Sequence, residues 1–389
     1  MSRFSEALIT RVVVRGFRSL EHVAVDLDPL TVLVGPNGSG KSSFLLAFNF
    51  LKDAIYPGPQ LRDVERFITK TNHGATAMSF EVHIRSRAPE IFEGVYFLRF
   101  QRREKLPEYF MAEETCTMKL ADAARYFSYT VQEKENQLQP PQWDSSEDFR
   151  PALAANRLAL PIMASLEAFA PMYKALTGFQ WYNIHPLTLR TPQRGGQGNQ
   201  LLPDGSNAAS ILKRLRDSKS PDFDRVISAL GYVVESVQNV DTSEAGQMLT
   251  IEFKEHFGRR RFSFPASDMS DGILHVLGIL LALYQEETPT LVGFEEPESA
   301  VHPGAVAALA EAFEEAALRT QVLVTTHSPD LITRFDVSRL RAVARTPRGD
   351  TAIGPIAESQ HASVQEQLFT TGELQRIEGL RPSSRTSGE

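Results

Sequence analysis

The chain contains a single cysteine, Cys116, so it cannot form an internal disulfide. This absence is typical of proteins from a reducing compartment. Long apolar runs are also missing, because the most apolar stretch, Ile273–Tyr284, is shorter than the ~20 residues that a membrane-spanning helix needs. The N-terminal segment lacks the continuous apolar core of a signal peptide. We therefore expect a cytoplasmic protein with no membrane partner, in which Ile273–Tyr284 forms a buried helix.

An excess of positive charge is absent as well. The 389 residues carry 41 Lys and Arg against 48 Asp and Glu, a net charge of −7. This balance argues against a uniformly basic nucleic-acid coat protein, although a local basic groove remains compatible with it, because binding responds to the local field. No heptad pattern of several repeats and no internal repeat is found, so neither a long coiled-coil arm nor a repeat architecture is expected.

Two groups of strand patterns flank a region with a helical pattern. Ile9–Val14, His22–Leu27 and Thr31–Val34 are predicted strands, and a helix is predicted from about Ser42. From residue 78 to about 135, the segments MSFEVHI, GVYFLRF and RYFSYTV predict an antiparallel sheet. The polar stretch 137–150 is predicted as a loop, residues 151–231 as mostly helical, and residues 233–264 as a second strand group.

The C-terminal part alternates between helices and strands. The predicted helices are Asp271–Gln285 and Gly304–Leu318, and the predicted strands are Thr290–Phe294 and Gln321–Thr325. This alternation is typical of a parallel sheet covered by helices. The fold class is therefore predicted as α/β, with a mostly parallel sheet, an antiparallel β-subdomain and a mainly helical insertion.

A complete G-x-x-x-x-G-K-[ST] motif lies between the strand Thr31–Val34 and the following helix. Its glycines allow backbone N–H groups to surround phosphates, and the helix N-terminus adds positive dipole character. Lys41 places a charge on the β- and γ-phosphates, and the Ser42 hydroxyl is a predicted ligand of Mg²⁺. The predicted ATP-binding residues here are Gly35, Pro36, Asn37, Gly38, Ser39, Gly40, Lys41, Ser42 and Ser43.

An acidic segment, EEPE, follows the apolar strand that ends at Phe294. Alone it would indicate an acidic turn. Together with a phosphate-binding lysine in an α/β chain, it matches the opposite side of a Mg–ATP site. One acid, Glu295, would orient the metal, and the next, Glu296, would accept a proton from the attacking water as general base.

Two further segments have both an ordinary and a functional interpretation. His327 follows the next predicted strand, so it is either a surface residue or a group that hydrogen-bonds the γ-phosphate or the attacking water. Ser270, Asp271 and Gly272 open the apolar helix. They form an ordinary N-cap with an acidic first turn, and they are small enough to approach the nucleotide of a second subunit.

In their order along the chain, these four elements resemble the ABC-type ATPase heads of the SMC, RecF and OLD-like proteins. The segment Gly16–Ser19, the GPNGSGKS loop, EEPE with the later His302-Pro303, and Thr326–Pro329 carry the resemblance. It is strongest over residues 9–50 and 264–345. The segments Asp204–Asn207 and Thr370–Leu374 are also similar to those of stand-alone bacterial AAA-domain predicted ATPases.

The resemblance implies a head that pairs face to face with a second copy around two ATP molecules. Each phosphate loop would meet the partner's Ser270–Gly272 cap, Arg18 would lie near the nucleotide, and His327 would sense the γ-phosphate. It also implies a division of the chain. Residues 1–135 and 233–380 would form the two halves of the head, residues 136–232 a mainly helical insertion, and residues 381–389 a disordered tail.

Three departures from the family pattern are visible. Glu295 stands where aspartate is more common, the cap reads SDG rather than LSGGQ, and no glutamine is found for the Q-loop, where residues 70–74 offer Asn72 or His73.

The client of such an ATPase is open to several interpretations. The first is action on double-stranded DNA, or with a DNA-acting effector, in repair or phage defence; the basic segments Lys213–Arg216 and Gly258–Arg261 would then bind phosphates, although both could be solvated surface. The second is a nucleotide-gated module that regulates a partner nuclease or toxin, with slow hydrolysis as a timer. A transporter subunit is disfavoured by the cap, the EEPE segment and the long insertion. Nuclease activity within the chain is not expected.

Overall fold

The structure is a computed structural model. It describes residues 7–56, 64–69, 77–87, 92–102, 109–120, 125–134, 137–138, 142–144, 157–196, 198–258, 260–299 and 301–383. The region 70–74, in which a Q-loop residue was sought, and Arg259 lie outside the described residues.

A central sheet of six strands organises the fold, with the order β10-β15-β16-β3-β17-β18. Every pairing in it is parallel except that of β17 with β18. Its strands are β3 (Leu30–Val34), β10 (Phe179–Tyr182), β15 (Leu291–Glu295), β16 (Gln321–Thr326), β17 (Leu340–Arg345) and β18 (Thr351–Pro355). This sheet confirms the predicted α/β class and the alternation of helices and strands.

The central sheet is buried on both faces, as the continuous apolar runs of its strands require. Val32, Val292 and Val324 belong to one hydrophobic core, whereas Leu33 and Leu323 belong to the other. The first core includes the helices α7 (Asp271–Tyr284) and α8 (Pro303–Ala317), and the second includes α1 (Lys41–Ile55). The apolar run that begins at Ile273 therefore forms a buried helix, as predicted.

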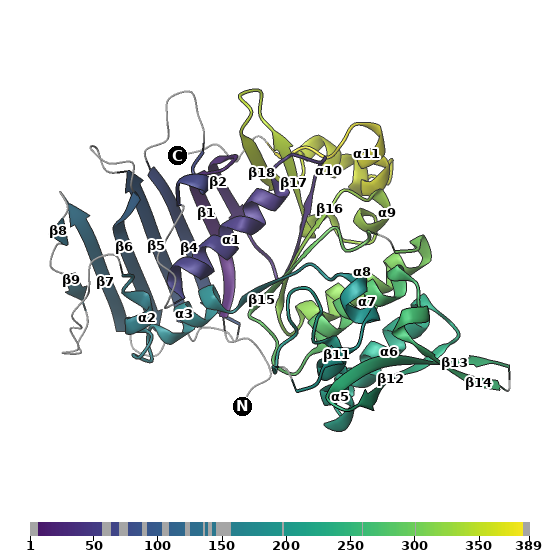
Figure 1. The fold of residues 1–389 in the computed structure, drawn as a ribbon. Helices are drawn as coiled ribbons and strands as arrows, with labels where there is room; N and C mark the ends of the chain where they lie inside the picture. The colour runs from purple at the N-terminus through teal and green to yellow at the C-terminus, as the bar shows by residue number, and fades with distance from the viewer. Residues whose placement is uncertain are drawn as a thin grey trace.

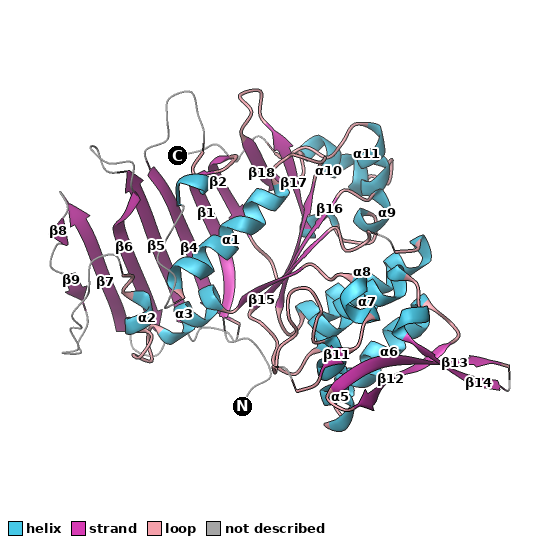
Figure 2. Ribbon diagram, in the orientation of Figure 1, coloured by secondary structure: helices cyan, strands magenta, loops and turns pink. Residues whose placement is uncertain are grey.

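An antiparallel sheet stands beside the central one (Figures 1 and 2). Its strands are β1 (Ala7–Phe17), β2 (Leu20–Asp26), β4 (Ala77–Ser86), β5 (Phe92–Arg102), β6 (Tyr109–Leu120), β7 (Arg125–Lys134), β8 (Gln137–Leu138) and β9 (Gln142–Asp144). Helix α1 lies across one face: the Phe50 ring contacts Phe17, Phe80 and Phe100 at centroid distances of 5.7, 5.4 and 5.8 Å. The antiparallel β-subdomain is thus present.

Several strands occur that the sequence pattern did not predict, among them β6, β10, β17 and β18. Strand β6 was missed because Glu114 occupies an inward position among Met111, Cys116 and Met118, which breaks the apolar alternation. Strand β10 lies in the region predicted as mostly helical, and its four residues extend the central sheet beside β15. The predicted loop 137–150 contains β8 and β9, and its other residues lie outside the described ranges.

Most of the remaining elements form a lobe under α7 and a C-terminal group of helices, whereas the short helices Leu160–Met163 and Ala170–Thr177 lie beside the antiparallel sheet (Figure 1). The lobe contains a third sheet, built from β11 (Gln193–Arg194), β12 (Val237–Ala245), β13 (Met248–Phe257) and β14 (Arg260–Pro265). The other helices are α2 (Leu160–Met163), α3 (Ala170–Thr177), α4 (Pro186–Arg190), α5 (Ala208–Asp217), α6 (Pro221–Val233), α9 (Pro329–Ile332), α10 (Glu358–Gln365) and α11 (Thr371–Ile377).

No helix in the described part of the chain is long and apolar enough to cross a membrane. Residues 381–383 contact the body, since the Arg381 carbonyl accepts a hydrogen bond from Ala357 and Ser383 donates one to Pro355. The division of the chain into two head halves, an insertion and a tail stays a prediction.

Candidate functional site

The phosphate loop follows β3 and leads directly into α1. Gly38 and Gly40 have φ angles of +75° and +116°, which residues with a Cβ rarely adopt. A Cβ on Gly40 would lie 2.0 Å from the Thr351 hydroxyl oxygen, and a Cβ on Gly35 would lie 2.1 Å from the Val343 carbonyl oxygen. Strands β17 and β18 therefore press against the loop so closely that only glycine fits at these two positions.

Lys41 extends back into this loop. Its Nζ donates hydrogen bonds to the carbonyl oxygens of Gly35, at 2.7 Å, and Pro36, at 3.1 Å. Burial lowers the pKa of Lys41, and the carboxylates of Glu296, Glu295 and Glu298 act in the opposite direction. The ammonium group is held among backbone oxygens, where an incoming phosphate could replace those acceptors.

The acidic segment stands opposite the loop, at the carboxyl end of β15. The Ser42 hydroxyl donates a hydrogen bond to Glu295 Oε1, so the predicted metal ligands are adjacent. Glu296 is anchored to β16 by a hydrogen bond from its backbone N–H to the Thr325 carbonyl, 2.9 Å. Its φ of +46° is unusual for a non-glycine residue and is a form of backbone strain that often accompanies function.

His327 follows β16 and turns toward the same acid. Its Nδ1 lies 2.9 Å from Glu296 Oε1. Next to this pair, the Thr326 hydroxyl donates to Glu298 Oε1, whereas Glu298 Oε2 is buried and has no hydrogen-bond partner in the described part of the chain. Burial raises the pKa of Glu298, against the effect of the Thr326 hydrogen bond. Two successive parallel strands thus bring the predicted base and the predicted sensor together, 31 residues apart in the chain.

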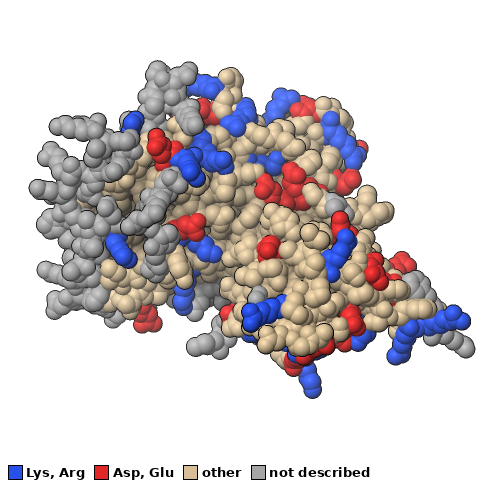
Figure 3. All heavy atoms as spheres, in the orientation of Figure 1, with Lys and Arg blue, Asp and Glu red and all other residues tan. Residues whose placement is uncertain are grey.

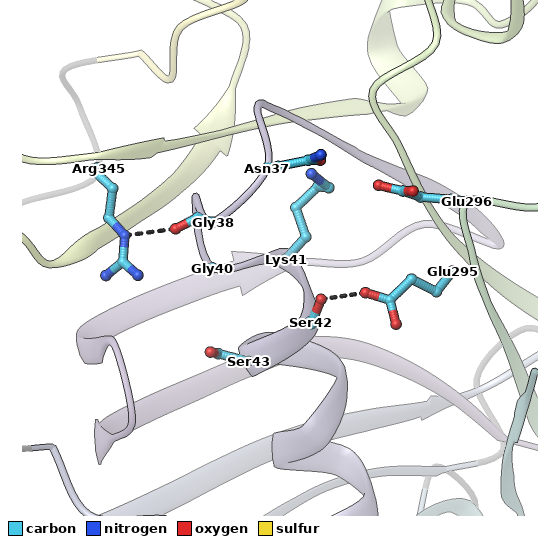
Figure 4. A pocket seen from close by; sticks show the side chains of 9 residues that line it. All are labelled: Asn37, Gly38, Gly40, Lys41, Ser42, Ser43, Glu295, Glu296 and Arg345. Atoms are coloured by element: carbon cyan, nitrogen blue, oxygen red, sulfur yellow. Dashed lines mark hydrogen bonds between the residues drawn. The ribbon is translucent and has the colours of Figure 1, made fainter. Parts of the chain in front are cut away.

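A cavity of about 340 Å³ separates the loop from the acids (Figure 4). Arg345, at the end of β17, approaches the loop from the side opposite Glu295 and Glu296, and its Nε donates to the Gly38 carbonyl at 2.8 Å. The cavity is lined by Asn37, Gly38, Gly40, Lys41, Ser42, Ser43, Glu295, Glu296 and Arg345. No sequence motif indicates Arg345; it reaches the cavity because the parallel pairing of β17 with β3 brings their carboxyl ends to one edge.

The cavity fits a triphosphate with its metal. The glycine cradle leaves no room for a Cβ at Gly35 or Gly40, and Ser39 Oγ is buried beside it without a hydrogen-bond partner among the described residues. Across the described ranges, no three His, Cys, Asp or Glu side chains are grouped closely enough to hold a metal ion. A cation at this site would therefore need Ser42, Glu295 and oxygens of the nucleotide itself, as a Mg–ATP complex supplies.

The other predicted residues lie outside the lining of this cavity. Arg18 has a φ of +49°, and its backbone N–H donates to the Phe67 carbonyl at 2.6 Å. Ser270 and Asp271 are exposed at the start of α7, where Ser270 Oγ accepts a hydrogen bond from the Ile273 N–H and Asp271 forms a 2.6 Å ion pair with Arg190. The N-cap interpretation of this segment is correct, and its contact with a second nucleotide stays a prediction.

Residues 30–333 match the model of a family described as "AAA domain, putative AbiEii toxin, Type IV TA system". This match covers most of the chain, so the protein belongs to that AAA-domain family. It carries a P-loop ATPase domain of the ABC type, as the resemblance implied.

Two curated proteins share sequence with the chain. The OLD nuclease of Thermus scotoductus is 40% identical over 50 residues, which cover 13% of this chain and 10% of the nuclease. Endonuclease GajA of Bacillus cereus is 20% identical over 362 residues, which cover 87% of this chain and 58% of GajA. The chain therefore spans a tenth of one relative and little more than half of the other.

Solved structures show the fold. An SMC head bound to the C-terminal winged-helix domain of ScpA has a TM-score of 0.54 at 12% identity, covering 91% of this chain and 99% of that one. The Pyrococcus furiosus SMC head with an extended coiled coil has a TM-score of 0.54 at 11% identity, covering 93% and 99%. The SMC-head-like architecture that the sequence predicted is confirmed.

Proposed function

We propose that this protein is an ATPase that cleaves the β–γ phosphoanhydride bond of Mg–ATP within a homodimer and acts on DNA. The observation that carries the proposal is the arrangement around Glu296. This acid is held by His327 and by a strained backbone, and it faces a glycine loop, Lys41 and Ser42 across one cavity.

The residues divide the chemistry as follows. Lys41 would exchange its backbone acceptors for β- and γ-phosphate oxygens. Ser42 and Glu295 would hold Mg²⁺, which supplies positive charge to the phosphates when it is bound. Glu296 would take the proton of the attacking water while the water oxygen bonds to the γ-phosphorus and ADP leaves. His327 would hydrogen-bond the γ-phosphate and orient the Glu296 carboxylate.

Arg345 is a further residue that we place among those that bind Mg–ATP. Its Nε and one amino group bind the carbonyl oxygens of Gly38 and Gly349, at 2.8 and 2.7 Å. This fixes the guanidinium on the rim of the cavity, away from the acids. We assign it to binding the nucleotide rather than to hydrolysis.

Dimerisation is proposed because the exposed Ser270–Gly272 cap does not line the cavity of its own chain. In a face-to-face pair it would contact the partner's nucleotide, while Arg18 would lie near the nucleotide of its own chain. Glu296→Gln keeps the shape and removes the base, so this variant should accumulate as a dimer with ATP. Light scattering coupled to size exclusion measures it. Monomer alone, well above nucleotide saturation, would contradict the dimer.

Action on DNA is tested by steady-state ATP hydrolysis with and without linear double-stranded DNA, with Lys41→Ala as the blank. Turnover that depends on Lys41 and rises with DNA is the expected result. A complete lack of Lys41-dependent turnover under both conditions would refute the ATPase assignment.

A second candidate function is regulation of a partner nuclease or toxin, with slow hydrolysis as a timer. It is supported by the family description, which names a toxin, and by the two curated relatives, which are nucleases. Turnover that ignores DNA but responds to a co-purified effector protein would favour this function over the first.

A further inference from the structure

The hairpin formed by β13 and β14 projects from the lower lobe, away from both larger sheets (Figure 1). Strand β14 pairs only with β13 in the described structure, so its other side is an open sheet edge. Figure 3 shows Lys and Arg side chains gathered at the end of this arm. The arm is therefore accessible along its whole outer side.

The cations at its tip differ from Lys213 and Arg216 of the other basic segment. Arg260 and Arg261 are exposed, and neither forms an ion pair within the described residues. By contrast, Lys213 is paired with Glu244, and Arg216 is paired with Asp217 and Asp241. In the segment Lys213–Arg216, two of the three cations are neutralised by ion pairs. The two hairpin arginines, by contrast, have no ion-pair partner among the described residues, so their charge is available to a polyanion.

Aromatic side chains accompany these two arginines. Phe262 and Phe264 point to the same face of β14, and their rings stack at a centroid distance of 6.1 Å with an interplanar angle of 20°. Phe264 is half-buried against the lobe, whereas Phe262 is 41% exposed. The rings thus form a step that leads from the apolar core to the solvent. Arg260 lies on the same face of β14 as these rings, and Arg261 lies on the opposite face.

We propose that this hairpin tip binds a nucleic-acid strand, with Arg260 and Arg261 on phosphates and Phe262 stacked on an unpaired base. Guanidinium groups suit phosphate oxygens, and an exposed ring next to a cationic track is the combination that holds single strands. A solely protective role for the arginines, which would keep an open strand edge from pairing with other chains, is the competing explanation.

The position of the hairpin connects this contact to the cleavage site. Strand β14 ends at Pro265, and the chain reaches Ser270, the cap of α7, through the short 3-10 turn Ala266–Asp268. Ala266 and Met269 are buried in the core of the lobe, which fixes this turn. A strand bound to the hairpin would therefore act on the segment that meets the second nucleotide. This part of the inference rests on the proposed function, but binding itself does not.

The experiment measures the affinity of the full chain for a fluorescent single-stranded oligonucleotide and for its duplex, over a series of salt concentrations. The test variant is Arg260→Gln with Arg261→Gln. The matched control is Lys213→Gln with Arg216→Gln, which removes the same charge from ion-paired positions. We expect the hairpin variant to bind the single strand about tenfold more weakly, with a salt slope reduced by about 1.4, or ~0.7 for each lost phosphate contact. The control should bind like the unchanged chain.

Phe262→Ala separates stacking from charge. We expect it to weaken single-strand binding about tenfold and duplex binding much less, because a duplex offers no free base faces. Equal affinity of the hairpin variant and the unchanged chain, or equal losses in the two double variants, would overturn the proposal. Self-association of the hairpin variant at unchanged affinity would do the same and would support edge protection. An equal loss on both nucleic acids in Phe262→Ala would overturn the stacking contact.

Lys41-dependent hydrolysis without nucleic acid serves as a separate readout for every variant. We expect it to be unchanged in all of them, which also shows that they are folded. If that hydrolysis is absent in the unchanged chain, the proposed function fails. The affinity series still decides whether the hairpin binds nucleic acid.

Discussion

The antiparallel sheet and the central parallel sheet both contain glutamates, but they use them in opposite ways. Glu114, in β6, is fully buried, and its carboxylate accepts hydrogen bonds from Tyr96, Tyr129 and the backbone N–H groups of Ala159 and Leu160. Glu295 and Glu296, at the end of β15, face a cavity and have few partners. The carboxylate of Glu114 is fully occupied by protein donors, whereas the carboxylates of Glu295 and Glu296 can still bind a ligand.

The difference follows from sheet type. An antiparallel strand sends alternate side chains into one core, so an acid there must be satisfied by protein groups. Burial still raises the pKa of Glu114, although the hydrogen bonds from Ala159, Leu160 and the two tyrosines lower it. In a parallel sheet, the strand interiors are apolar, and polar side chains collect where the strands end. A buried glutamate inside an antiparallel strand therefore indicates a structural role, and a glutamate at the carboxyl end of a parallel strand indicates a ligand-binding or catalytic role.

The largest expected effect concerns the acid at the site. Glu296→Gln should lower kcat for ATP hydrolysis by about 10²- to 10⁴-fold, the range for loss of a general base, without lowering the melting temperature. The exposed Glu286→Gln is the control and should hydrolyse ATP normally. Steady-state kinetics with thermal unfolding of the same samples measures both. A tenfold loss or less would remove Glu296 from the chemistry.

Substitution of Glu114, the acid in the antiparallel sheet, is expected to lower the stability of the protein rather than its rate of ATP hydrolysis. Glu114→Ala leaves two tyrosine hydroxyls and two backbone N–H groups without their acceptor, so it should lower the free energy of unfolding by about 3 kcal/mol. Glu113→Ala, which removes a partly exposed ion pair with Arg99 and a hydrogen bond from Gln132, should cost about 1 kcal/mol or less. Denaturant titration measures both. Similar losses would mean that the buried network contributes little.

A smaller effect is expected where β18, at the edge of the central sheet, contacts the phosphate loop. Gly40→Ala would clash with Thr351 at a strained φ, so we expect weaker ATP binding and a loss of about 2 kcal/mol of stability. Gly38→Ala also has a positive φ, but its Cβ would enter open space, and about 1 kcal/mol is expected. Calorimetric titration with ATP and thermal unfolding compare the two. Equal effects would show that the contact with β18 is unimportant.

The smallest effect is a pH dependence of stability that comes from Glu114. Because its folded pKa is raised above the ordinary value of 4.5, its contribution to stability is complete below pH 4.5 and is lost as the pH rises through the folded pKa. Glu114→Gln cannot titrate. The unfolding free energy of the unchanged chain should therefore fall relative to this variant as the pH rises above 4.5. A constant difference across that range would contradict the raised pKa.

Much of the fold and the site could be predicted because their signals are local. The phosphate loop needs glycines at fixed spacing before a helix, and EEPE and His327 each follow an apolar strand, so a few neighbouring residues identify them. Strand β6 was missed because Glu114 lies at an inward position, where the pattern requires an apolar residue. Strand β10 was missed because a strand of only four residues has no clear periodicity.

What the sequence determined by itself is the class of the protein, through an α/β pattern of strands and helices, a glycine loop and acids placed after strands. The tertiary structure alone decided which charged residues are available. Arg345 reaches the cavity because β17 pairs with β3. Lys213 and Arg216 are neutralised by Glu244 and Asp241, more than twenty residues away in the chain, whereas Arg260 and Arg261, on the projecting hairpin, have no ion-pair partner among the described residues. Ion pairing depends on distances of a few ångströms between remote segments, and only the folded chain sets those distances.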